Sequence, residues 1–302
     1  MNNKKPFSIG ADVGGTNLRA ALVDNNGNIL EKIKTSSQNN AVETLTDAID
    51  KLFTKEVKSI GLAIAGLIDN KSKTVIQSPN LRMIENIDLI DILSKKYNVP
   101  VNIGNDANLA ALGESIKGAG ANCDSFILLT LGTGIGGGIV LNSALVNAAA
   151  ELGHIIIAEG GRVCGCFNKG CLEAYASSTA IVKSAKHKIT AGTSTSMVMQ
   201  NNNITPEYIY NSAVNGDSLA LELLKEAGYY LGIGIGSMIN IFSPDAVILT
   251  GGLVGAWDIY VEAAIDSAKK TALAPLFTKT KIIPAQLPDD AGLIGASYLA
   301  YV

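Results

Sequence analysis

The chain has 302 residues, of which 47% are hydrophobic and 17% are charged. This length and apolar content suffice for two hydrophobic cores, because one domain takes about 100–200 residues. The formal net charge is −3, and no long block of lysine and arginine occurs. We therefore expect neither a nucleic acid nor an anionic membrane as a partner.

The start of the chain, Met1 to Pro6, is polar and runs directly into an apolar stretch, so we expect no signal peptide. Four cysteines in a chain without a leader indicate a reducing compartment, and we expect a cytoplasmic protein. One uncharged run, Ala227 to Pro244, stops short of the ~20 apolar residues that a bilayer requires. Its glycines recur at every fourth position, which favours a buried, closely packed helix.

The first half of the chain reads as alternating strands and helices, which is typical of an α/β fold. The predicted strands are Phe7 to Ala11, Leu18 to Val23, Ile29 to Lys34, Ser59 to Ala65 and Val101 to Ile103. The predicted helices are Ala41 to Leu52, Asp88 to Tyr97 and one that begins at Ala107.

The second half repeats this plan around an irregular insert that contains cysteines. The predicted strands are Phe126 to Thr130, Ile139 to Leu141 and Ala246 to Leu249. The predicted helices are Ala174 to Lys188, Ser218 to Ile241, Ile259 to Thr271 and Ala291 to Tyr301. We expect an N-terminal lobe of residues 1–117 and a C-terminal lobe of residues 118–290 with an insert at about 151–173. The closing helix, at about 291–302, is expected to pack back onto the first lobe.

Two glycine-rich turns, Asp12 to Thr16 and Leu131 to Gly136, each lie between two predicted strands. Glycine lets a backbone approach a phosphate closely and expose its N–H groups. A P-loop or a dinucleotide-binding fingerprint needs a helix after the glycines, and neither run has one. Either turn alone is as easily a simple hairpin, but the pair favours a duplicated phosphate clamp. Asp12 beside a triphosphate then requires a divalent cation, held through its water shell.

Asp106 follows the predicted strand Val101 to Ile103 and begins a helix. By propensity alone it is a helix N-cap that accepts backbone N–H bonds. The alternative is a general base that takes the proton from an attacking hydroxyl during phosphoryl transfer.

Four potential metal ligands, His154, Cys164, Cys166 and Cys171, follow one another within eighteen residues. Three thiols and one imidazole suit tetrahedral zinc, whereas the alternative is three unconnected reduced cysteines in a loop. Because all four positions would be protein ligands, such a metal would be structural. Cys123 and His187 lie outside the group.

Several of these motifs together resemble the ROK family of repressors, open reading frames and sugar kinases. The resemblance covers essentially the whole chain and is carried by Asp12 to Arg19, Gly104 to Ala107, Leu131 to Gly138, Glu151 to His154 and Cys164 to Glu173. It implies a two-lobed, actin-like ATPase fold of the ribonuclease H-like class with internal duplication. ROK repressors carry an additional N-terminal helix-turn-helix domain, and this chain starts at the first kinase strand, so it resembles the kinases.

The resemblance also implies roles for individual residues. Asp106 would be the catalytic base, and the sugar would be bound by Asn80, Asn105, Asp106, Glu151, His154 and Glu173. ATP with Mg²⁺ would be bound by Asp12, Gly14, Gly15, Thr16, Asn17, Thr133, Gly134, Gly251 and Gly252. Structural zinc would be held by His154, Cys164, Cys166 and Cys171, and the family implies a homodimer or homotetramer.

Two features depart from the family pattern. Phe167 stands where glycine usually follows the second cysteine, so the backbone there is expected to differ. The stretch from Gly138 to Glu151 is a few residues short and carries Asn147 to Ala150 where glycines are common. Since that loop would border the sugar, substrate identity is less determined than the reaction.

We therefore predict an ATP-dependent kinase for the 6-hydroxyl of an aldohexose, with glucose as the leading candidate. N-acetylmannosamine, N-acetylglucosamine, glucosamine, fructose and allose are alternative substrates. A sugar-sensing ROK protein without catalysis is the alternative from another class, and Asp106 argues against it because a sensor needs no base. An actin-like polymer or chaperone nucleotidase would leave Glu151, His154, Glu173 and the cysteines unexplained.

Overall fold

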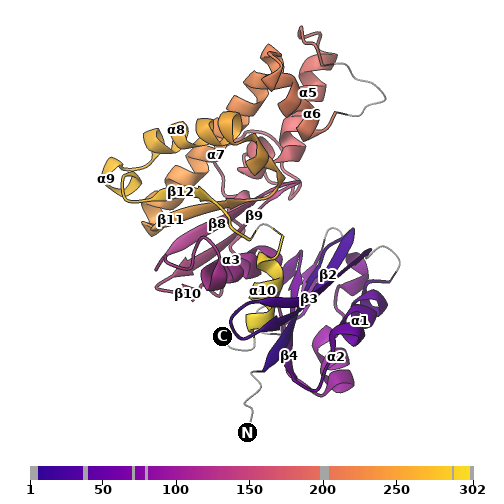
Figure 1. Ribbon diagram of the computed structural model, residues 1–302. Coiled ribbons are helices and arrows are strands. Elements are labelled where there is room, and N and C mark those ends of the chain that lie inside the picture. Colours follow the sequence, from indigo (N-terminus) through magenta and orange to yellow (C-terminus); the bar gives the residue numbers. More distant parts are fainter. Residues whose placement is uncertain are drawn as a thin grey trace. The chain divides into compact units, whose positions relative to one another are not determined.

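The computed structural model describes residues 6–36, 40–69, 72–78, 81–197, 204–287 and 289–299. Contacts divide the chain into two compact units (Figure 1). Unit 1 comprises Met1–Asp124, Gly138–Ala150 and Ala285–Val302, and unit 2 comprises Ser125–Gly137 and Glu151–Pro284. The chain thus passes between the units more than once, and the single boundary at residue 117 stays a prediction.

Unit 1 is built on a five-stranded mixed sheet with the order β3-β2-β1-β4-β7. Its strands are β1 Phe7–Val13, β2 Asn17–Asp24, β3 Ile29–Ser36, β4 Val57–Ile64 and β7 Val101–Asn105. β1, β2 and β3 form an antiparallel meander, while β4 and β7 add in parallel to β1. β1 and β4 are apolar almost throughout because helices cover both faces of the sheet.

One face of this sheet is covered by α1 Ala41–Leu52 and α2 Leu89–Tyr97, which share a large apolar core with alternate strand residues. The other face carries α3 Asp106–Lys117 and α10 Ala291–Tyr298 (Figure 1). α10 lies very close to the strands, because a Cβ at Gly10 would stand 1.9 Å from the Leu293 carbonyl oxygen. Glycine at this position therefore lets the last helix seat on the sheet.

Short elements complete unit 1. β5 Leu67–Ile68 and β6 Val75–Gln77 form a two-stranded ribbon, followed by a 3₁₀ turn at Arg82–Ile84. The ribbon was not predicted, since two or three residues give too little alternation to reveal a strand.

The second sheet has the order β10-β9-β8-β11-β12. If the strands of each sheet are counted along the chain, both sheets have the order third, second, first, fourth, fifth. Its strands are β8 Phe126–Leu131, β9 Ile135–Leu141, β10 Ala144–Leu145, β11 Ala246–Thr250 and β12 Lys281–Pro284. β11 pairs in parallel with both β8 and β12. The predicted internal duplication is confirmed.

Unit 2 is mostly helical outside the strands that it contributes to the second sheet. The helices are α4 Glu173–Ala176, α5 Ser178–Thr190, α6 Pro206–Val214, α7 Ser218–Phe242, α8 Glu262–Thr271 and α9 Ala274–Phe277. Single 3₁₀ or π turns occupy Leu152–His154, Gly252–Ala256 and Trp257–Val261. The one helix predicted from Ala174 to Lys188 is interrupted at Ser177, whose extended backbone and hydroxyl cap the start of α5.

α7 contains the glycine-rich uncharged run and packs along α8 (Figure 1). A Cβ at Gly228 would lie 2.2 Å from the Tyr260 carbonyl oxygen, and one at Gly232 would lie 2.3 Å from that of Ala264. The predicted close helix packing is therefore present.

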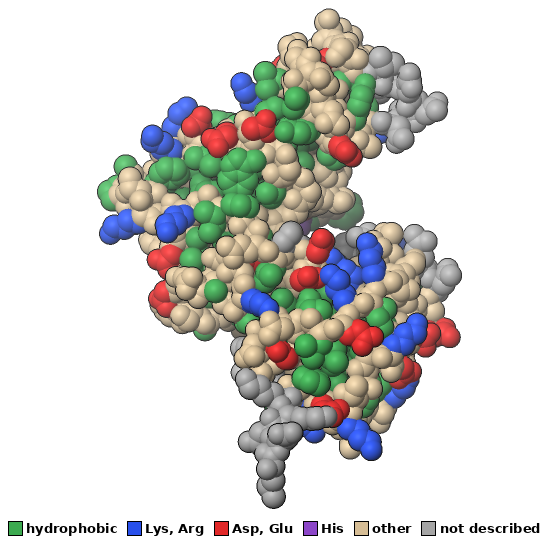
Figure 2. Space-filling view, in the orientation of Figure 1, with side chains coloured by type: hydrophobic (Ala, Val, Ile, Leu, Met, Phe, Trp, Pro, Cys, Tyr) green, Lys and Arg blue, Asp and Glu red, His purple; other side chains and the backbone are tan. Residues whose placement is uncertain are grey.

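Among the residues that the structure describes, no helix is long and apolar enough to span a bilayer. Lysine and arginine lie among aspartate and glutamate on the face shown in Figure 2.

The start of α7 depends on a buried carboxylate, Asp217, which is 6% exposed. It accepts hydrogen bonds from the Ala220 and Ser196 backbone N–H groups at 2.8 and 2.6 Å, and from the hydroxyls of Thr195 and Ser196 at 2.7 and 2.8 Å. Burial alone raises the pKa of Asp217, but these hydrogen bonds outweigh it and lower the pKa to about 2. Asp217 thus fastens residues 195–196 to the helix.

We predict that Asp217→Asn destabilises the protein at neutral pH by about 2 kcal/mol, the equivalent of this pKa shift. The folded-state pKa lies below the unfolded value, so the stabilisation is complete above the unfolded value and is lost as the pH falls through the folded one. Urea unfolding from pH 7 towards about pH 2 should show the gap between variant and wild type closing. Asp258→Asn, which alters an exposed carboxylate bonded to Tyr210, is the control and should show no such trend. A gap that does not depend on pH would contradict the assignment.

Candidate active site and metal centre

The first glycine turn joins β1 to β2 in unit 1, and the Gly14 N–H donates to the Asn17 carbonyl at 3.0 Å. Gly14 and Gly15 are partly buried, while Thr16 and Asn17 are exposed. Asp12 lies one residue inside the end of β1, opposite Arg19 of β2. The turn is therefore the predicted hairpin tip, with backbone and small polar side chains at the surface.

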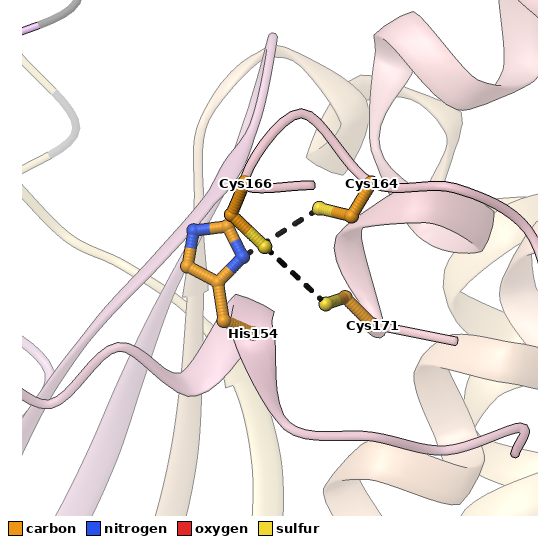
Figure 3. Close-up of side chains that lie close together, drawn as sticks. All are labelled: His154, Cys164, Cys166 and Cys171. Atoms are coloured by element: carbon orange, nitrogen blue, oxygen red, sulfur yellow. Dashed lines mark hydrogen bonds between the residues drawn. The ribbon is translucent and has the colours of Figure 1, made fainter. Parts of the chain in front are cut away.

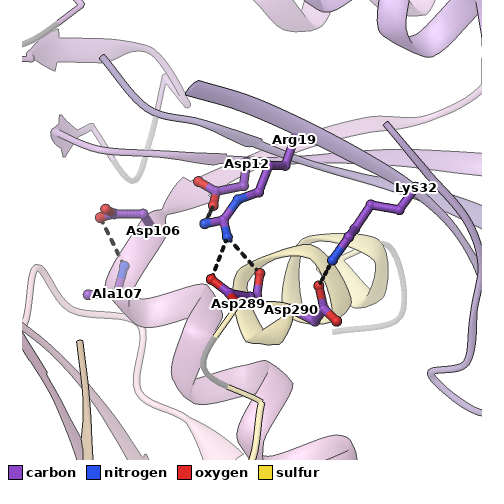
Figure 4. A network of polar contacts seen from close by, with 7 residues as sticks. All are labelled: Asp12, Arg19, Lys32, Asp106, Ala107, Asp289 and Asp290. Atoms are coloured by element: carbon purple, nitrogen blue, oxygen red, sulfur yellow. Dashed lines mark hydrogen bonds and ion pairs between the residues drawn. The ribbon is translucent and has the colours of Figure 1, made fainter. Parts of the chain in front are cut away.

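Arg19 binds the Asp12 carboxylate directly, with Nη2 2.6 Å from Oδ2 (Figure 4). The Asp12 side chain is 17% exposed, so this carboxylate is mostly enclosed yet reachable from solvent. Carboxylate oxygens are the ligands that Mg²⁺ takes in proteins, usually together with water and substrate phosphates. Asp12 thus has the chemistry of a Mg²⁺ ligand, and that role stays a prediction.

Asp106 begins α3 directly after β7, and it is partly buried. The N-cap is not Asp106 but Asn105, whose Oδ1 accepts from the Ala107 and Asn108 N–H groups at 3.0 and 3.1 Å. Asp106 Oδ1 also accepts from Ala107 N–H, at 2.9 Å (Figure 4). The capping role expected for Asp106 by propensity therefore belongs to its neighbour.

Strand register places Asp106 at the same edge of the sheet as the first glycine turn. Val13 of β1 pairs with Ile64 of β4, and Ile64 pairs with Asn105 of β7. The carboxyl ends of these three parallel strands hence meet at one edge, the position where α/β sheets bind ligands. Asn80, the other predicted sugar contact of this unit, lies outside the described residues.

Asn105 and Asn108 have further partners around this edge. Asn105 Nδ2 donates to the Gly66 carbonyl at 3.0 Å, and Asn108 Nδ2 donates to the Ala148 carbonyl at 2.9 Å. Asn108 Oδ1 is buried and has no hydrogen-bond partner among the described residues. Asn108 thereby ties the short loop before Glu151 to α3, a link that no sequence motif indicated.

The second glycine turn joins β8 to β9 in unit 2 and is held by Glu173 of α4. Glu173 Oε2 accepts from the Ile135 N–H at 2.9 Å. A Cβ at Gly134 would lie 2.4 Å from the same oxygen, so glycine leaves room for the carboxylate. β9 begins at Ile135, earlier than predicted, and Gly136 to Gly138 are part of the strand.

Gly251 lies beside this turn at the end of β11. Thr130 of β8 pairs with Thr250 of β11, so the turn and Gly251 share one edge of the second sheet. Gly251 has φ +98°, and a Cβ there would approach the Leu131 carbonyl oxygen to 2.4 Å. Only glycine fits this backbone without strain.

A hollow of about 360 Å³ opens next to Thr133. Thr179 Oγ1 donates to the Thr133 carbonyl at 2.7 Å, which connects the turn to the first residues of α5. The hollow is lined by Thr133, Ser178, Thr179, Val182, Lys183, Lys186 and Pro206. Hydroxyls, a helix N-terminus, two ammonium groups and apolar surface suit an anionic ligand with an apolar part.

The four predicted metal ligands come together in the insert, with their ligand atoms all within 4.8 Å of one another (Figure 3). Cys166 Sγ lies 3.6 Å from Cys171 Sγ, and Cys164 Sγ lies 3.6 Å from His154 Nδ1. Ligands on a tetrahedron around one zinc, with bonds of about 2.0–2.3 Å, are about 3.6 Å apart. The donor set and its spacing therefore fit a tetrahedral metal.

Burial works against ionisation of two of the three thiols in the cluster. Burial raises the pKa of the Cys164 thiol to about 12, and burial also raises the pKa of Cys171. A coordinated metal reverses this tendency, because a thiol bound to it is deprotonated. His154 turns Nδ1 to the thiols and places Nε2 3.9 Å from Glu151 Oε2, and Glu173 Oε1 lies 3.7 Å from Cys164 Sγ. The cluster thus adjoins both predicted sugar-binding carboxylates of unit 2.

Phe167 stands where the family pattern has glycine, but its backbone keeps the left-handed conformation that glycine favours. Its φ is +70°, its side chain is 91% exposed, and its N–H donates to the Cys164 carbonyl at 3.0 Å. The ligand loop therefore keeps a left-handed turn at a cost in strain for a residue with a Cβ.

A family model described as the ROK family matches residues 8–302. The glucokinase of Halalkalibacterium halodurans is 33% identical over 310 residues, covering 96% of this chain and 94% of that protein. The xylose repressor of Bacillus subtilis is 31% identical, covering 98% of this chain and 77% of the repressor. A crystal structure of a ROK family glucokinase from Streptomyces griseus in complex with glucose and AMPPNP is 32% identical, with a TM-score of 0.80 over 97% of this chain and 98% of that one.

These similarities extend over both units and include both sheets. Together with the repeated strand order, they confirm the predicted α/β fold class of actin-like ATPases with internal duplication. The chain belongs to the ROK family.

Proposed function

We propose that this protein is an ATP-dependent hexose kinase that transfers the γ-phosphate of ATP to the 6-hydroxyl of an aldohexose, with glucose as the leading substrate. The observation that carries the proposal is the placement of Asp106 and the first glycine turn at one sheet edge, repeated by the second turn and Gly251 in the other sheet. The glucokinase relatives, one of which was crystallised with glucose and AMPPNP, support the substrates.

Asp106 is the proposed general base. The sugar hydroxyl oxygen forms a bond to the γ-phosphorus, the bond from that phosphorus to the β,γ-bridging oxygen breaks, and ADP leaves. The hydroxyl proton passes to the Asp106 carboxylate. Phosphoryl transfer depends mainly on positioning and charge neutralisation, so one well-placed carboxylate suffices. Asn105 is the proposed neighbour that contacts the sugar, although its Oδ1 already caps α3.

ATP is proposed to be bound through backbone N–H groups of the two turns, with Thr133 and the hollow beside it receiving part of the nucleotide. Gly251 and Gly252 would allow the adenosine to lie against the end of β11. Asp12 would hold Mg²⁺, which neutralises charge on the phosphates when bound.

Zinc is the proposed metal of the insert, held by His154 Nδ1 and the three thiolates. With four protein ligands it would be structural and leave no open position for water. It would hold Glu151, His154 and Glu173 in fixed relative positions, which are the three residues proposed to contact the sugar from unit 2. No disulfide joins the four cysteines, all of which lie in the described part of the chain, and this supports a reducing, cytoplasmic location. A homodimer or homotetramer is the proposed assembly.

A sugar-sensing protein without catalysis is the second candidate, and the similarity to a xylose repressor favours it. A coupled assay of ADP release separates the two candidates when run with glucose, N-acetylmannosamine, N-acetylglucosamine, glucosamine, fructose, allose and xylose. Turnover with glucose supports the kinase. Sugar binding by calorimetry without any ADP release would support the sensor and overturn the kinase.

We predict that Asp106→Asn lowers kcat by about 10²–10⁴-fold, because asparagine keeps the size of the side chain but cannot take the hydroxyl proton. Glucose affinity, measured by calorimetry, should stay close to that of the wild type.

Asp88→Asn is the matched control, since Asp88 is a carboxylate at the start of α2 that caps the helix through the Asp91 N–H at 2.9 Å. Its kcat should be that of the wild type. If Asp106→Asn also had the kcat of the wild type, Asp106 would have only a structural role at the start of α3.

We further predict about one zinc per chain in the wild type by elemental analysis, and loss of that zinc in Cys166→Ala. Sugar affinity and turnover should fall more than nucleotide affinity, because the second glycine turn has hydrogen bonds of its own from Gly132 and Gly136.

Cys123→Ala removes a thiol outside the cluster and should keep both metal and activity. A metal-free wild type with full activity would refute the zinc proposal. Unchanged sugar affinity and turnover in Cys166→Ala would make the metal irrelevant to the site.

A further inference from the structure

Arg19 makes contacts that its place beside the glycine turn alone does not require. Its guanidinium reaches across from β2 to two segments that are far apart in the sequence (Figure 4). Nη2 donates to Asp12 Oδ2 at 2.6 Å, and Nη1 donates to the backbone carbonyl of Asp289 at 2.9 Å. Nη1 also lies 3.3 Å from Asp289 Oδ1. Arg19 thus joins Asp12 to the turn that leads into α10.

The two ends of this link differ in strength. The Asp289 side chain is 84% exposed, so its carboxylate is well solvated and adds little to the link. The Asp289 carbonyl belongs to the main chain just before α10, whose close seating on β1 fixes that turn. Arg19 is therefore anchored on a backbone atom, and its other nitrogen holds Asp12.

A planar guanidinium suits this task, because its donors have a fixed fork geometry and retain their charge at all physiological pH values. A charge-assisted bond to one carboxylate oxygen restricts the rotamer of Asp12 and uses only part of the acceptor capacity of a carboxylate. Mg²⁺ demands nearly ideal octahedral geometry, so a small rotation of a carboxylate that holds its ligand shell would be costly.

We infer that Arg19 is a positioning residue that fixes the Asp12 carboxylate for magnesium-bound ATP and ties it to the turn before α10. This inference rests on the proposed kinase function. It predicts that loss of Arg19 weakens the magnesium-dependent part of nucleotide binding, whereas a purely structural ion pair would affect only stability.

The chain provides a matched control on the next strand. Lys32 of β3 lies 2.6 Å from Asp290 Oδ1, so it makes an ion pair with the same turn but does not contact Asp12 (Figure 4). Lys32→Met removes a cation and a bond to this turn, as Arg19→Met does. The two variants differ in whether Asp12 loses its partner.

The experiment compares Arg19→Met, Arg19→Lys and Lys32→Met with the wild type. Calorimetry measures AMPPNP binding with excess Mg²⁺ and with EDTA, and a Mg²⁺ titration of turnover gives the half-saturating concentration. Removal of a residue that orients a metal ligand typically costs about 10–100-fold in metal affinity. We expect a shift of about 10-fold in the Mg²⁺ requirement for Arg19→Met, a smaller shift for Arg19→Lys, and none for Lys32→Met.

Asp12→Asn tests whether Arg19 acts through Asp12. In that background, Arg19→Met should add no further loss of magnesium-dependent binding. Full additivity of the two changes, or equal behaviour of Arg19→Met and Lys32→Met, would overturn the inference. Thermal midpoints check folding, and if Arg19→Met does not fold, an unshifted Mg²⁺ requirement in Arg19→Lys would overturn it instead.

Failure of the proposed function gives a different result. A wild type that shows neither ADP release with any sugar nor magnesium-dependent AMPPNP binding would refute the kinase and this inference together. A wild type that is an active kinase while Arg19→Met keeps its normal Mg²⁺ requirement would refute the role of Arg19 alone.

Discussion

The Glu173 carboxylate is the interaction on which the arrangement of unit 2 depends. One oxygen accepts from the Ile135 N–H of the second glycine turn, and the other lies beside the Cys164 thiol of the metal-ligand cluster. A single side chain therefore connects the element expected to bind phosphate with the element expected to hold zinc. Glu173 also begins α4, so this contact adds to the hydrogen bonds that Gly132 and Gly136 make within the turn itself.

The two glycine turns occupy equivalent places in the two sheets. The side chains that support them, however, are of opposite charge. In unit 1 the support is the cation Arg19, which holds the anionic Asp12 beside the turn. In unit 2 it is the anion Glu173, which accepts directly from the backbone after Gly134. The first arrangement orients a carboxylate, which is the proposed Mg²⁺ ligand, and the second holds a backbone N–H group at the end of the turn. The two sheets thus share a strand order, whereas the side chains that support their glycine turns differ.

Hydrophobic pattern and glycine spacing were enough to predict most strands, a duplicated glycine turn and an α/β fold, whereas the actin-like fold class was implied by the family resemblance. Residues that are close in the sequence, such as His154 and the three cysteines, were also grouped correctly, because a short loop can gather them. β12 and α6 were missed, since four residues beside a proline and a short helix give weak periodic signals. The contacts of Arg19 with Asp289 and of Glu173 with the Ile135 N–H were missed, because they join segments that are far apart in the sequence. The register of the first hairpin would have been enough to place Arg19 opposite Asp12.

The ligand loop shows how tertiary constraints override local preference. At Phe167 a left-handed backbone costs a residue with a Cβ about 1–2 kcal/mol. The side chain is 91% exposed, so burial of the ring does not offset that cost. The turn is closed instead by the Cys164 N–H, which donates to the Asn168 carbonyl at 2.8 Å, and it lies between Cys164 and Cys171, whose thiols are near His154. Contacts between residues on both sides of Phe167 thus accompany a backbone conformation that its own preference disfavours.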